Sequence, residues 1–411
     1  MNAKAAACTQ KRWLSIVGIG EDGVEGLSSI ARRLIRSAEL VIGGARHLEL
    51  AANLICGRRL AWPSPMSEAF GEIERHRGRP VAILASGDPF HFGVGKQLAA
   101  FIPVEEFICL PQPSAFSLAA ARMGWSLQDV SLVTLHGRAL HGIIRHLQPG
   151  ARILALSWDN TTPAKLAELL NGRRMGQSLI TVLESMSGPR ERIRQAKASN
   201  FGIEPIVPLN TIAIEVIAEP ETATIALAPG LDDGFFEHDG QLTKREIRAV
   251  TLSSLEPHQG ELLWDVGLGA GSIAIEWLLR HPSLSAIGIE ARGDRADRAA
   301  RNAAALGVPE LKIVHGHAPE ALAGLARPDA VFVGGGMMDN GVFEAVWSAL
   351  KPGGRLVANA ISLETEARLA DYFGRFGGDL VRLQVARIDK VGSLSGWRPA
   401  LPVTQWRVRK P

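Results

Sequence analysis

The pattern of hydrophobic and polar residues is clearest at positions 262–279, where a strand, a turn and a helix follow one another. An apolar run opens this stretch, the turn Asp265-Val-Gly-Leu-Gly-Ala-Gly271 follows, and apolar residues then recur at helical spacing. Glycine tolerates positive φ and lets a ligand approach the backbone, while the first N–H groups of a helix have no partner inside it. The pattern therefore predicts a nucleotide-binding turn.

The spacing of glycines and acids indicates which nucleotide this turn would bind. Gly267, Gly269 and Gly271 form G-x-G-x-G, whereas the dinucleotide fingerprint G-x-G-x-x-G requires a glycine where Ser272 stands. The next apolar run ends on Glu290, whose carboxylate can accept hydrogen bonds from both hydroxyls of a ribose. An ordinary tight turn in some other α/β domain is the alternative interpretation.

Strand-like and helical stretches continue to alternate after Glu290. The apolar runs 311–318, 330–336 and 355–359 are separated by helical stretches of ~10–15 residues, which predicts a doubly wound parallel sheet. Upstream, Thr243 and Glu246 have the spacing of a capping box at the start of a helix. Thr243 is therefore expected to cap this helix, to contact a ligand, or both.

The first half of the chain is also predicted to be an α/β domain. Its apolar runs are 13–20, 40–44, 81–84 and 106–110, and the helix between the first two predicts a parallel βαβ unit. The third run leads into Ser-Gly-Asp-Pro, which places Asp88 at the carboxyl edge of a sheet, where open α/β sheets bind ligands. Ser114 is expected to cap a helix that runs to Met123.

The remaining segments complete the predicted domain organisation. Apolar runs at 131–136, 152–156, 179–183 and 210–216 predict a second lobe that begins near residue 126, with a polar turn at 184–192. Proline, glycine and acidic residues without periodicity at 219–239 predict an interdomain linker. We therefore expect one domain at 13–218, with lobes of about 13–125 and 126–218, and a second at 240–411.

Composition narrows the classes of function. A net charge of +3, from 45 basic and 42 acidic residues, and 6% aromatic residues predict no nucleic-acid partner. Cys8, Cys56 and Cys109 form no C-x-x-C pattern and are expected to be free thiols. Residues 1–12 carry no secretory apolar region, and no segment is apolar enough to span a bilayer. The expected location is the cytoplasm, without a membrane partner.

Four motifs of the first half carry a family resemblance. VGIG, SGDPFHFGVG, PQPSAFSLAAARMGW and SLVTLHGR together resemble the tetrapyrrole methylase family across about residues 15–219. The resemblance implies two α/β lobes with S-adenosylmethionine between them. Glu21 replaces the proline that usually follows the first glycines. The cofactor contacts that the resemblance implies are Ser86, Gly87, Asp88, His91, Ser114 and Ala115.

A different resemblance covers the second half. LTKREIR, DVGLGAGS, HAPEAL, FVGGG and KPGGRLVANA resemble the decarboxylating cobalt-precorrin methyltransferases, which have the Rossmann-like class I methyltransferase fold. His317 stands where that family more often has Asp or Asn. The implied S-adenosylmethionine contacts are Thr243, Gly267, Leu268, Gly269, Ala270, Gly271, Glu290, His317 and Ala318.

Joined in this order, the two halves resemble the bifunctional precorrin methyltransferases of cobalamin biosynthesis. The resemblance implies methylation of precorrin-6Y at carbon 5 by the first half. It implies methylation at carbon 15 and decarboxylation of the ring C acetate by the second, with precorrin-8X as product. One S-adenosylmethionine site per half and a homo-oligomer are also implied, and no metal is expected because His315 and His317 lack a third ligand.

The carboxylates of such a substrate would pair with basic side chains. A solvated surface explains each basic residue equally well without a ligand. The candidates are Arg138, Arg190 and Arg192 in the first half and Lys244, Arg245 and Arg248 in the second.

Three other functions fit parts of the chain. The second half alone would suit a methyltransferase acting on RNA or protein, although the sequence has neither a basic stripe nor an aromatic platform. The same folds would also suit another step of corrinoid methylation, or a non-catalytic S-adenosylmethionine sensor. Titration of the cofactor with and without a tetrapyrrole would distinguish the sensor from the enzymes.

Overall fold

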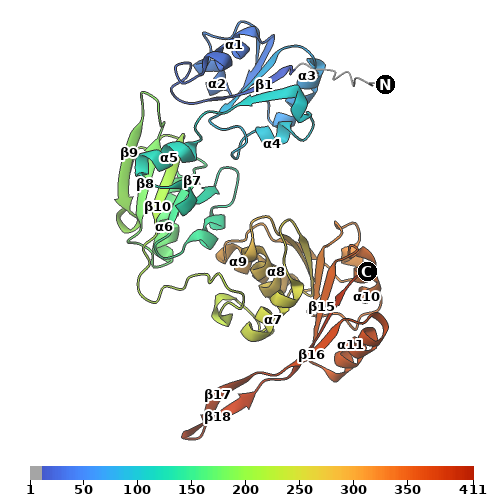
Figure 1. Cartoon of the computed structure of the whole chain (residues 1–411). Coiled ribbons are helices and arrows are strands. Elements are labelled where there is room, and N and C mark those ends of the chain that lie inside the picture. Colours follow the sequence, from blue (N-terminus) through green and yellow to red (C-terminus); the bar gives the residue numbers. More distant parts are fainter. Residues whose placement is uncertain (1–11) are drawn as a thin grey trace, which may run out of the picture. The chain divides into compact units, whose positions relative to one another are not determined.

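The computed structural model describes residues 12–411, which form two compact units. One unit contains the chain up to Arg138 together with Gln148–Ala223, and the other contains Ala139–Leu147 and Thr224–Pro411. Both units are of the α/β class, as predicted (Figure 1). Cys56 and Cys109 are free thiols, whereas Cys8 and the N-terminal stretch examined for a secretory signal fall at or before residue 12, almost wholly outside the described residues. Within residues 12–411, no helix is both long and apolar enough to cross a bilayer.

The first lobe is a five-stranded parallel sheet in the order β3-β2-β4-β1-β5. β1 and β2 are buried along their whole length because helices cover both faces of the sheet, as is typical of parallel sheets. The strands are β1 (Leu14–Ile19), β2 (Leu40–Gly43), β3 (Arg58–Ala61), β4 (Val81–Ser86) and β5 (Phe107–Leu110), and the helices are α1 (Ser29–Ser37), α2 (Ala45–Leu50), α3 (Phe70–Arg75) and α4 (Gly95–Leu98).

The second lobe has a mixed sheet in the order β6-β7-β10-β8-β9, in which only β6 and β7 are parallel. The sequence pattern did not predict β9, whose side chains are mostly polar and exposed. The elements are α5 (Ala115–Met123), β6 (Ser131–Thr134), β7 (Arg152–Leu156), α6 (Thr162–Gly172), β8 (Leu179–Glu184), β9 (Arg192–Lys197) and β10 (Asn210–Glu215).

The C-terminal unit contains a seven-stranded sheet in the order β13-β12-β11-β14-β15-β19-β16. Its first five strands are parallel, and β19 is antiparallel to both of its neighbours. The strands are β11 (Leu262–Val266), β12 (Ser285–Glu290), β13 (Lys312–His315), β14 (Ala330–Val333), β15 (Arg355–Ala360), β16 (Asp379–Leu383) and β19 (Val403–Arg409). The helices are α7 (Arg245–Leu255), α8 (Ser272–Arg280), α9 (Gly293–Ala305), α10 (Val342–Ala349) and α11 (Leu363–Phe376).

Two features of this unit were not predicted. β16 and β19 extend the sheet beyond β15, and an aromatic cluster of Phe343, Tyr372 and Trp406 packs there. In addition, β17 (Ala386–Val391) and β18 (Leu394–Pro399) form a hairpin that extends away from the sheet (Figure 1).

The stretch 219–239 is not a free linker along its whole length. The backbone N–H groups of Gly230 and Leu231 donate to the buried carboxylate of Glu276, at 2.7 and 2.9 Å. Glu237 is held at its backbone N–H and C=O by the side chain of Asn302 on α9. The second part of this stretch is therefore bound to the C-terminal unit.

Candidate cofactor and substrate sites

The glycine-rich turn between β11 and α8 has a backbone that other residues would strain. Gly267, Gly269 and Gly271 have φ values of +76°, +57° and +80°. A Cβ at Gly267 would lie 2.9 Å from the backbone nitrogen of Gly335, in the turn after β14. The turn therefore lies between the carboxyl ends of β11 and β14, where the strand order of the sheet reverses and open α/β sheets bind ligands.

Glu290 closes this turn from the neighbouring strand. Its carboxylate accepts one hydrogen bond from the N–H of Gly269 at 2.8 Å and another from the N–H of Arg292 at 3.0 Å. A carboxylate offers about four acceptor positions, so two remain for the hydroxyls of a ribose. The carboxylate therefore fits the sugar of a nucleoside-type cofactor, and the glycine backbone leaves room for the rest of that cofactor.

Asp265 binds the first turn of the helix that follows the glycine turn. Its side chain is buried, and one carboxyl oxygen accepts a hydrogen bond from the N–H of Ala274 in the first turn of α8, at 3.0 Å. Burial, with a smaller contribution from the negative charge of Glu290, raises the pKa of Asp265 to about 8. The Asp265 side chain therefore positions the helix and does not face solvent.

His317 and Ala318 follow β13, the strand next to β12. The N–H of Gly316 donates to the carbonyl of Glu290 at 2.9 Å, so this turn lies beside the expected ribose position. The side chain of His317 is exposed, and Ala318 packs partly against the core. The fold thus brings the turns after β11, β12 and β13 together at one sheet edge.

Thr243 does not have the predicted capping role. α7 begins at Arg245, its N-cap residue is Lys244, and no side-chain hydrogen bond caps it. Glu246 instead pairs with Arg387. The capping-box prediction is therefore wrong, and no hydrogen bond in the described part of the chain joins Thr243 to the glycine turn.

Arg248 is also not a substrate-facing residue. Its side chain is fully buried, and its Nε donates to Glu276 at 2.5 Å. The two terminal nitrogens bind the carbonyls of Leu231 and Thr243, and the guanidinium lies over the ring of Phe236, 4.7 Å from its centroid. The prediction for Arg248 is wrong because helical spacing does not distinguish a surface arginine from one that fills a buried polar site.

Of the neighbouring cations, Lys244 lies 3.7 Å from Asp233 and Arg245 is exposed. Both can still reach a ligand.

In the N-terminal unit, the backbone at the end of β1 approaches those that follow β4 and β5. A Cβ at Gly18 would lie 1.9 Å from the carbonyl oxygen of Gly87, and a Cβ at Gly87 would lie 2.8 Å from the carbonyl oxygen of Pro113. Only glycine fits at both positions, and Gly87 also has a φ of +51°. The Ser-Gly-Asp-Pro turn is thereby brought against the segment that leads into α5.

The other predicted residues lie around this junction. Ser114 caps α5 as predicted, accepting a hydrogen bond from the N–H of Ser117 at 3.2 Å, and Ala115 is the first residue of the helix. Asp88 accepts from the N–H of Phe90 at 2.9 Å, which fixes the turn. The ring of His91 lies 4.8 Å from that of Phe116 on α5. These residues are therefore gathered at one place, with Ser86 exposed at the end of β4.

Sequence reasoning missed a polar cluster at the same sheet edge. Arg46 pairs with Glu21, and its NH2 group donates to the Oγ of Ser86 at 3.1 Å and lies 3.0 Å from Nε2 of His47. His47 Nε2 is also 2.9 Å from Ser86 Oγ. Burial and the adjacent charge of Arg46 lower the pKa of His47 to about 4. The glutamate in place of proline at position 21 was the only hint of this cluster in the sequence.

The three arginines proposed for the first half have different surroundings. Arg138 is exposed and lies over the ring of Phe92, 5.9 Å from its centroid. Arg190 is exposed on the turn after β8. Arg192 donates two hydrogen bonds, of 2.8 and 2.7 Å, to the buried carboxylate of Glu184. Arg192 is thus committed to an ion pair, whereas Arg138 and Arg190 keep donors that face solvent.

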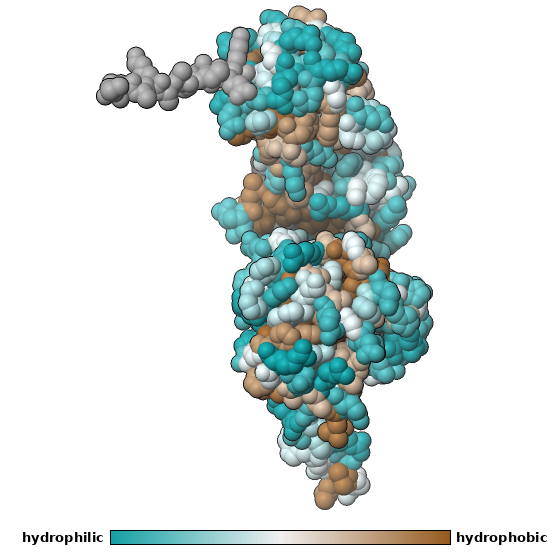
Figure 2. Space-filling view, turned by 90° about the vertical axis from the view of Figure 1, so that its right-hand side faces the viewer, coloured by the Kyte–Doolittle hydropathy of each residue, from teal (hydrophilic) through white to brown (hydrophobic). Residues whose placement is uncertain are grey.

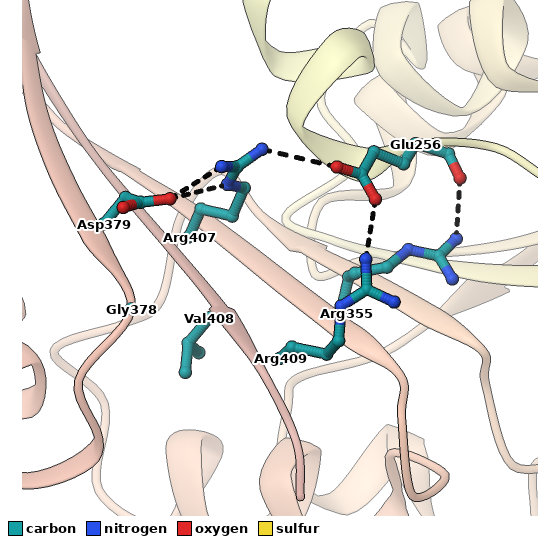
Figure 3. Close-up of a pocket in the computed structure, with 7 residues that line it drawn as sticks. All are labelled: Glu256, Arg355, Gly378, Asp379, Arg407, Val408 and Arg409. Atoms are coloured by element: carbon teal, nitrogen blue, oxygen red, sulfur yellow. Dashed lines mark hydrogen bonds and ion pairs between the residues drawn. The ribbon is translucent and has the colours of Figure 1, made fainter.

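A charged pocket of about 250 Å³ lies at the opposite edge of the C-terminal sheet (Figure 3). Glu256 binds Arg407 and Arg409, and Arg407 also binds Asp379 (Figure 3). Arg355, the first residue of β15, pairs with Glu261. The guanidinium groups of this pocket are already paired, and the pocket lies at the opposite end of the strands from the glycine turn. We therefore interpret it as a network of ion pairs.

Within residues 12–411, no group of three or more His, Cys, Asp or Glu side chains is arranged to hold a metal ion.

Comparisons with known proteins agree with this two-part organisation. Residues 14–201 match the Tetrapyrrole (Corrin/Porphyrin) Methylases, and residues 234–410 match the Precorrin methyltransferase domain. A cobalt-precorrin-7 C(5)-methyltransferase of Salmonella typhimurium is 27% identical over 44% of this chain and 88% of its own length. A probable cobalt-precorrin-6B C(15)-methyltransferase (decarboxylating) of Saccharolobus solfataricus is 34% identical over 39% of this chain and 82% of its own.

A third relative spans both parts. A precorrin-6Y C(5,15)-methyltransferase (decarboxylating) of a Sinorhizobium species is 54% identical over 394 residues, which make up 96% of this chain and 95% of the relative. Identity of this level over nearly the whole of both chains shows a common family. The chain belongs to the precorrin-6Y C(5,15)-methyltransferase (decarboxylating) family.

Proposed function

We propose that this protein methylates precorrin-6Y at carbons 5 and 15 and removes the carboxyl group of the ring C acetate, giving precorrin-8X in cobalamin biosynthesis. The single observation that carries this proposal is the 54% identity, over 95% of its length, with a relative named for these activities. The enzyme is thus a decarboxylating methyltransferase, and its methyl donor is S-adenosylmethionine.

Each unit is proposed to hold one molecule of this donor. In the C-terminal unit, Glu290 would orient the ribose while the backbone of Gly267–Gly271 lies against the rest of the cofactor, with His317 and Ala318 beside it. In the N-terminal unit, the donor would lie at the junction of Ser86, Gly87 and Asp88 with Ser114 and Ala115, next to His91. Positive-φ glycines at a sheet edge support both assignments, and the free acceptor positions of Glu290 support the assignment in the C-terminal unit.

The chemistry asks little of the protein beyond positioning. When bound, S-adenosylmethionine supplies an electrophilic methyl group, and the meso carbons of a reduced tetrapyrrole are nucleophilic. The chain's own residues would hold the two reactants in line and exclude water. Arg138, Arg190, Lys244 and Arg245 would pair with substrate carboxylates, since each retains exposed donors. Decarboxylation can use the conjugated ring as its electron sink.

We assign carbon 5 to the N-terminal domain, proposed at 13–218, and carbon 15 with decarboxylation to the C-terminal domain, proposed at 240–411. Two relatives named for the separate activities each cover less than half of this chain and more than four fifths of their own length, which supports this division.

The division is tested by mass spectrometry of the product made by the full chain, by Asp88→Ala and by Glu290→Ala, with reduced precorrin-6 and S-adenosylmethionine under anaerobic conditions. The wild type should add two methyl groups and lose one carbon dioxide. Asp88→Ala should lose only the carbon-5 methyl, and Glu290→Ala only the other two steps. Equal loss of all three steps in a folded variant would contradict the division of labour, and an unchanged substrate with the wild type would contradict the proposed function.

We also propose that the enzyme is a homo-oligomer whose contact includes the hairpin β17–β18. An isolated two-stranded hairpin is marginally stable in water, and here the cross-strand pairs Ile388 with Trp397 and Val391 with Leu394 are exposed. Figure 2 shows hydrophobic side chains near the tip of this hairpin. Coverage by a second copy would remove this apolar surface from water.

A further inference from the structure

The guanidinium of Arg46 links three neighbouring strand ends of the first sheet. Arg46 lies in α2, immediately after β2, and pairs with Glu21, which follows β1. It also donates to the Oγ of Ser86, the last residue of β4, at 3.1 Å. Since β2, β4 and β1 are adjacent in the sheet, the positive charge lies at the centre of the carboxyl edge. The proposed function assigns Ser86 at this same edge to the cofactor site.

His47 fixes the direction of this guanidinium. Its Nε2 lies 3.0 Å from the NH2 group of Arg46, a cation that can only donate, so Nε2 is the acceptor. Because the pKa of His47 is lowered to about 4, the ring is neutral at physiological pH and does not repel Arg46. The NH2 group is therefore held by two partners, His47 and Ser86, which orient the plane of the guanidinium.

Arg46 still has donors to offer. One NH1 hydrogen goes to Glu21 and both NH2 hydrogens go to His47 and Ser86. Among the described residues, the Nε–H and the second NH1 hydrogen donate to no protein group. The side chain is 36% exposed, so a ligand at the sheet edge can reach these donors. The pairing with Glu21 shows that a carboxylate fits against this guanidinium.

The second lobe reaches the same cluster. Gly188 lies in the turn after β8, and a Cβ there would be 2.7 Å from the Cβ of Glu21. The turn that carries Gly188 also carries Arg190, whose side chain is exposed. Arg46 is therefore beside the seam between the two lobes of this unit, where a ligand held by both lobes would lie.

We infer that Arg46 binds a carboxylate of a ligand in the N-terminal site, with His47 and Ser86 as its positioning residues. The inference rests on the proposed function, which supplies two such ligands: the methionine part of S-adenosylmethionine and the carboxylate side chains of the tetrapyrrole. A charge-assisted hydrogen bond to a preoriented guanidinium gives about a tenfold or larger gain in affinity.

Calorimetric titration of the full-length protein tests the inference without requiring turnover. Wild type, Arg46→Gln and Arg46→Lys are each titrated with S-adenosylmethionine and, separately, with the reduced tetrapyrrole substrate. Arg58→Gln is the matched control, because Arg58 pairs with Glu72 at the opposite edge of the same sheet. Thermal melting checks that each variant is folded.

We expect Arg46→Gln to raise the Kd of one of the two ligands at its N-terminal site at least tenfold. Arg46→Lys should restore part of the lost affinity, and Arg58→Gln should bind both ligands as the wild type does. Weakened cofactor binding would identify the methionine carboxylate, and weakened substrate binding would identify a tetrapyrrole carboxylate. Unchanged affinity for both ligands in folded Arg46→Gln would overturn the inference. Failure of the wild type to methylate would contradict the proposed function and leave these affinities as the test of Arg46.

Discussion

The buried ion pair between Arg248 and Glu276 gives the sharpest prediction about stability. Arg248 has no exposed surface, and its removal would leave the carboxylate of Glu276 buried, with the N–H groups of Gly230 and Leu231 as its hydrogen-bond partners among the described residues. Removing one member of a buried pair costs about 3–5 kcal/mol, because the other charge stays desolvated. We therefore expect Arg248→Met to lower the free energy of unfolding of the C-terminal unit by this amount.

The loss is large enough to measure in urea. At a denaturant dependence of roughly 2–3 kcal/mol per molar urea, the midpoint should fall by about 1–2.5 M. Hydrogen-exchange mass spectrometry of peptides from α7 and α8 along a urea series would follow this unit separately from the other. Adding Glu276→Gln should recover part of the stability, because the neutral amide needs no counterion, although its NH2 group cannot accept one of the two backbone N–H bonds that the carboxylate accepts. Arg245→Met, on the exposed start of the same helix, should change the free energy of unfolding by less than about 0.5 kcal/mol.

The reasoning would be refuted if Arg248→Met kept the wild-type midpoint and raised the KM for the tetrapyrrole. That result would make Arg248 a substrate ligand, as its sequence position first suggested.

Two further predictions concern pH and assembly. Because the pKa of Asp265 is raised from 3.8 to about 8, the folded protein retains a proton that the unfolded chain releases, and this group's contribution to stability declines as pH rises from about 4 to 8. Asp265→Asn should therefore gain stability relative to the wild type progressively over that range in urea unfolding, and a difference independent of pH would contradict the assignment. In the proposed homo-oligomer, Trp397→Ser should shift the mass measured by light scattering toward smaller species, because the side chain is 74% exposed on the hairpin. Trp158→Ser, an exposed tryptophan of the other unit, should leave the mass unchanged, and equal masses for all three proteins would exclude the hairpin as a contact.

The elements that the sequence predicted are those with a strong local pattern. The parallel strands that precede the glycine turn and Glu290 were found where the apolar runs placed them, because strands buried on both faces are apolar throughout. β9 was missed because its side chains are polar and exposed, and its place in the sheet comes from pairing with β8. Pairing of this kind depends on residues that are distant in sequence or on the opposite strand, which a local pattern does not record.

The candidate sites also contain residues that could be predicted from the sequence and residues that could not. The glycines were predictable, since their positive φ values and close backbone contacts exclude other residues. The roles of the charged residues were not, because a burial site for Arg248 or a partner such as Ser86 for Arg46 exists only after the chain has folded. A charge can be read from the sequence, but the group that neutralises it cannot.

The position of β19 between β15 and the edge strand β16 affects the order in which the chain can fold during synthesis. Among the strands of residues 12–411, β16 pairs with β19 alone, and β19 is made twenty or more residues later. Until β19 leaves the ribosome, one edge of β15 is unpaired and β16 has no strand to join. The last strand of the first unit ends at residue 215, so this unit can complete its sheets before β19 of the second unit has been synthesised.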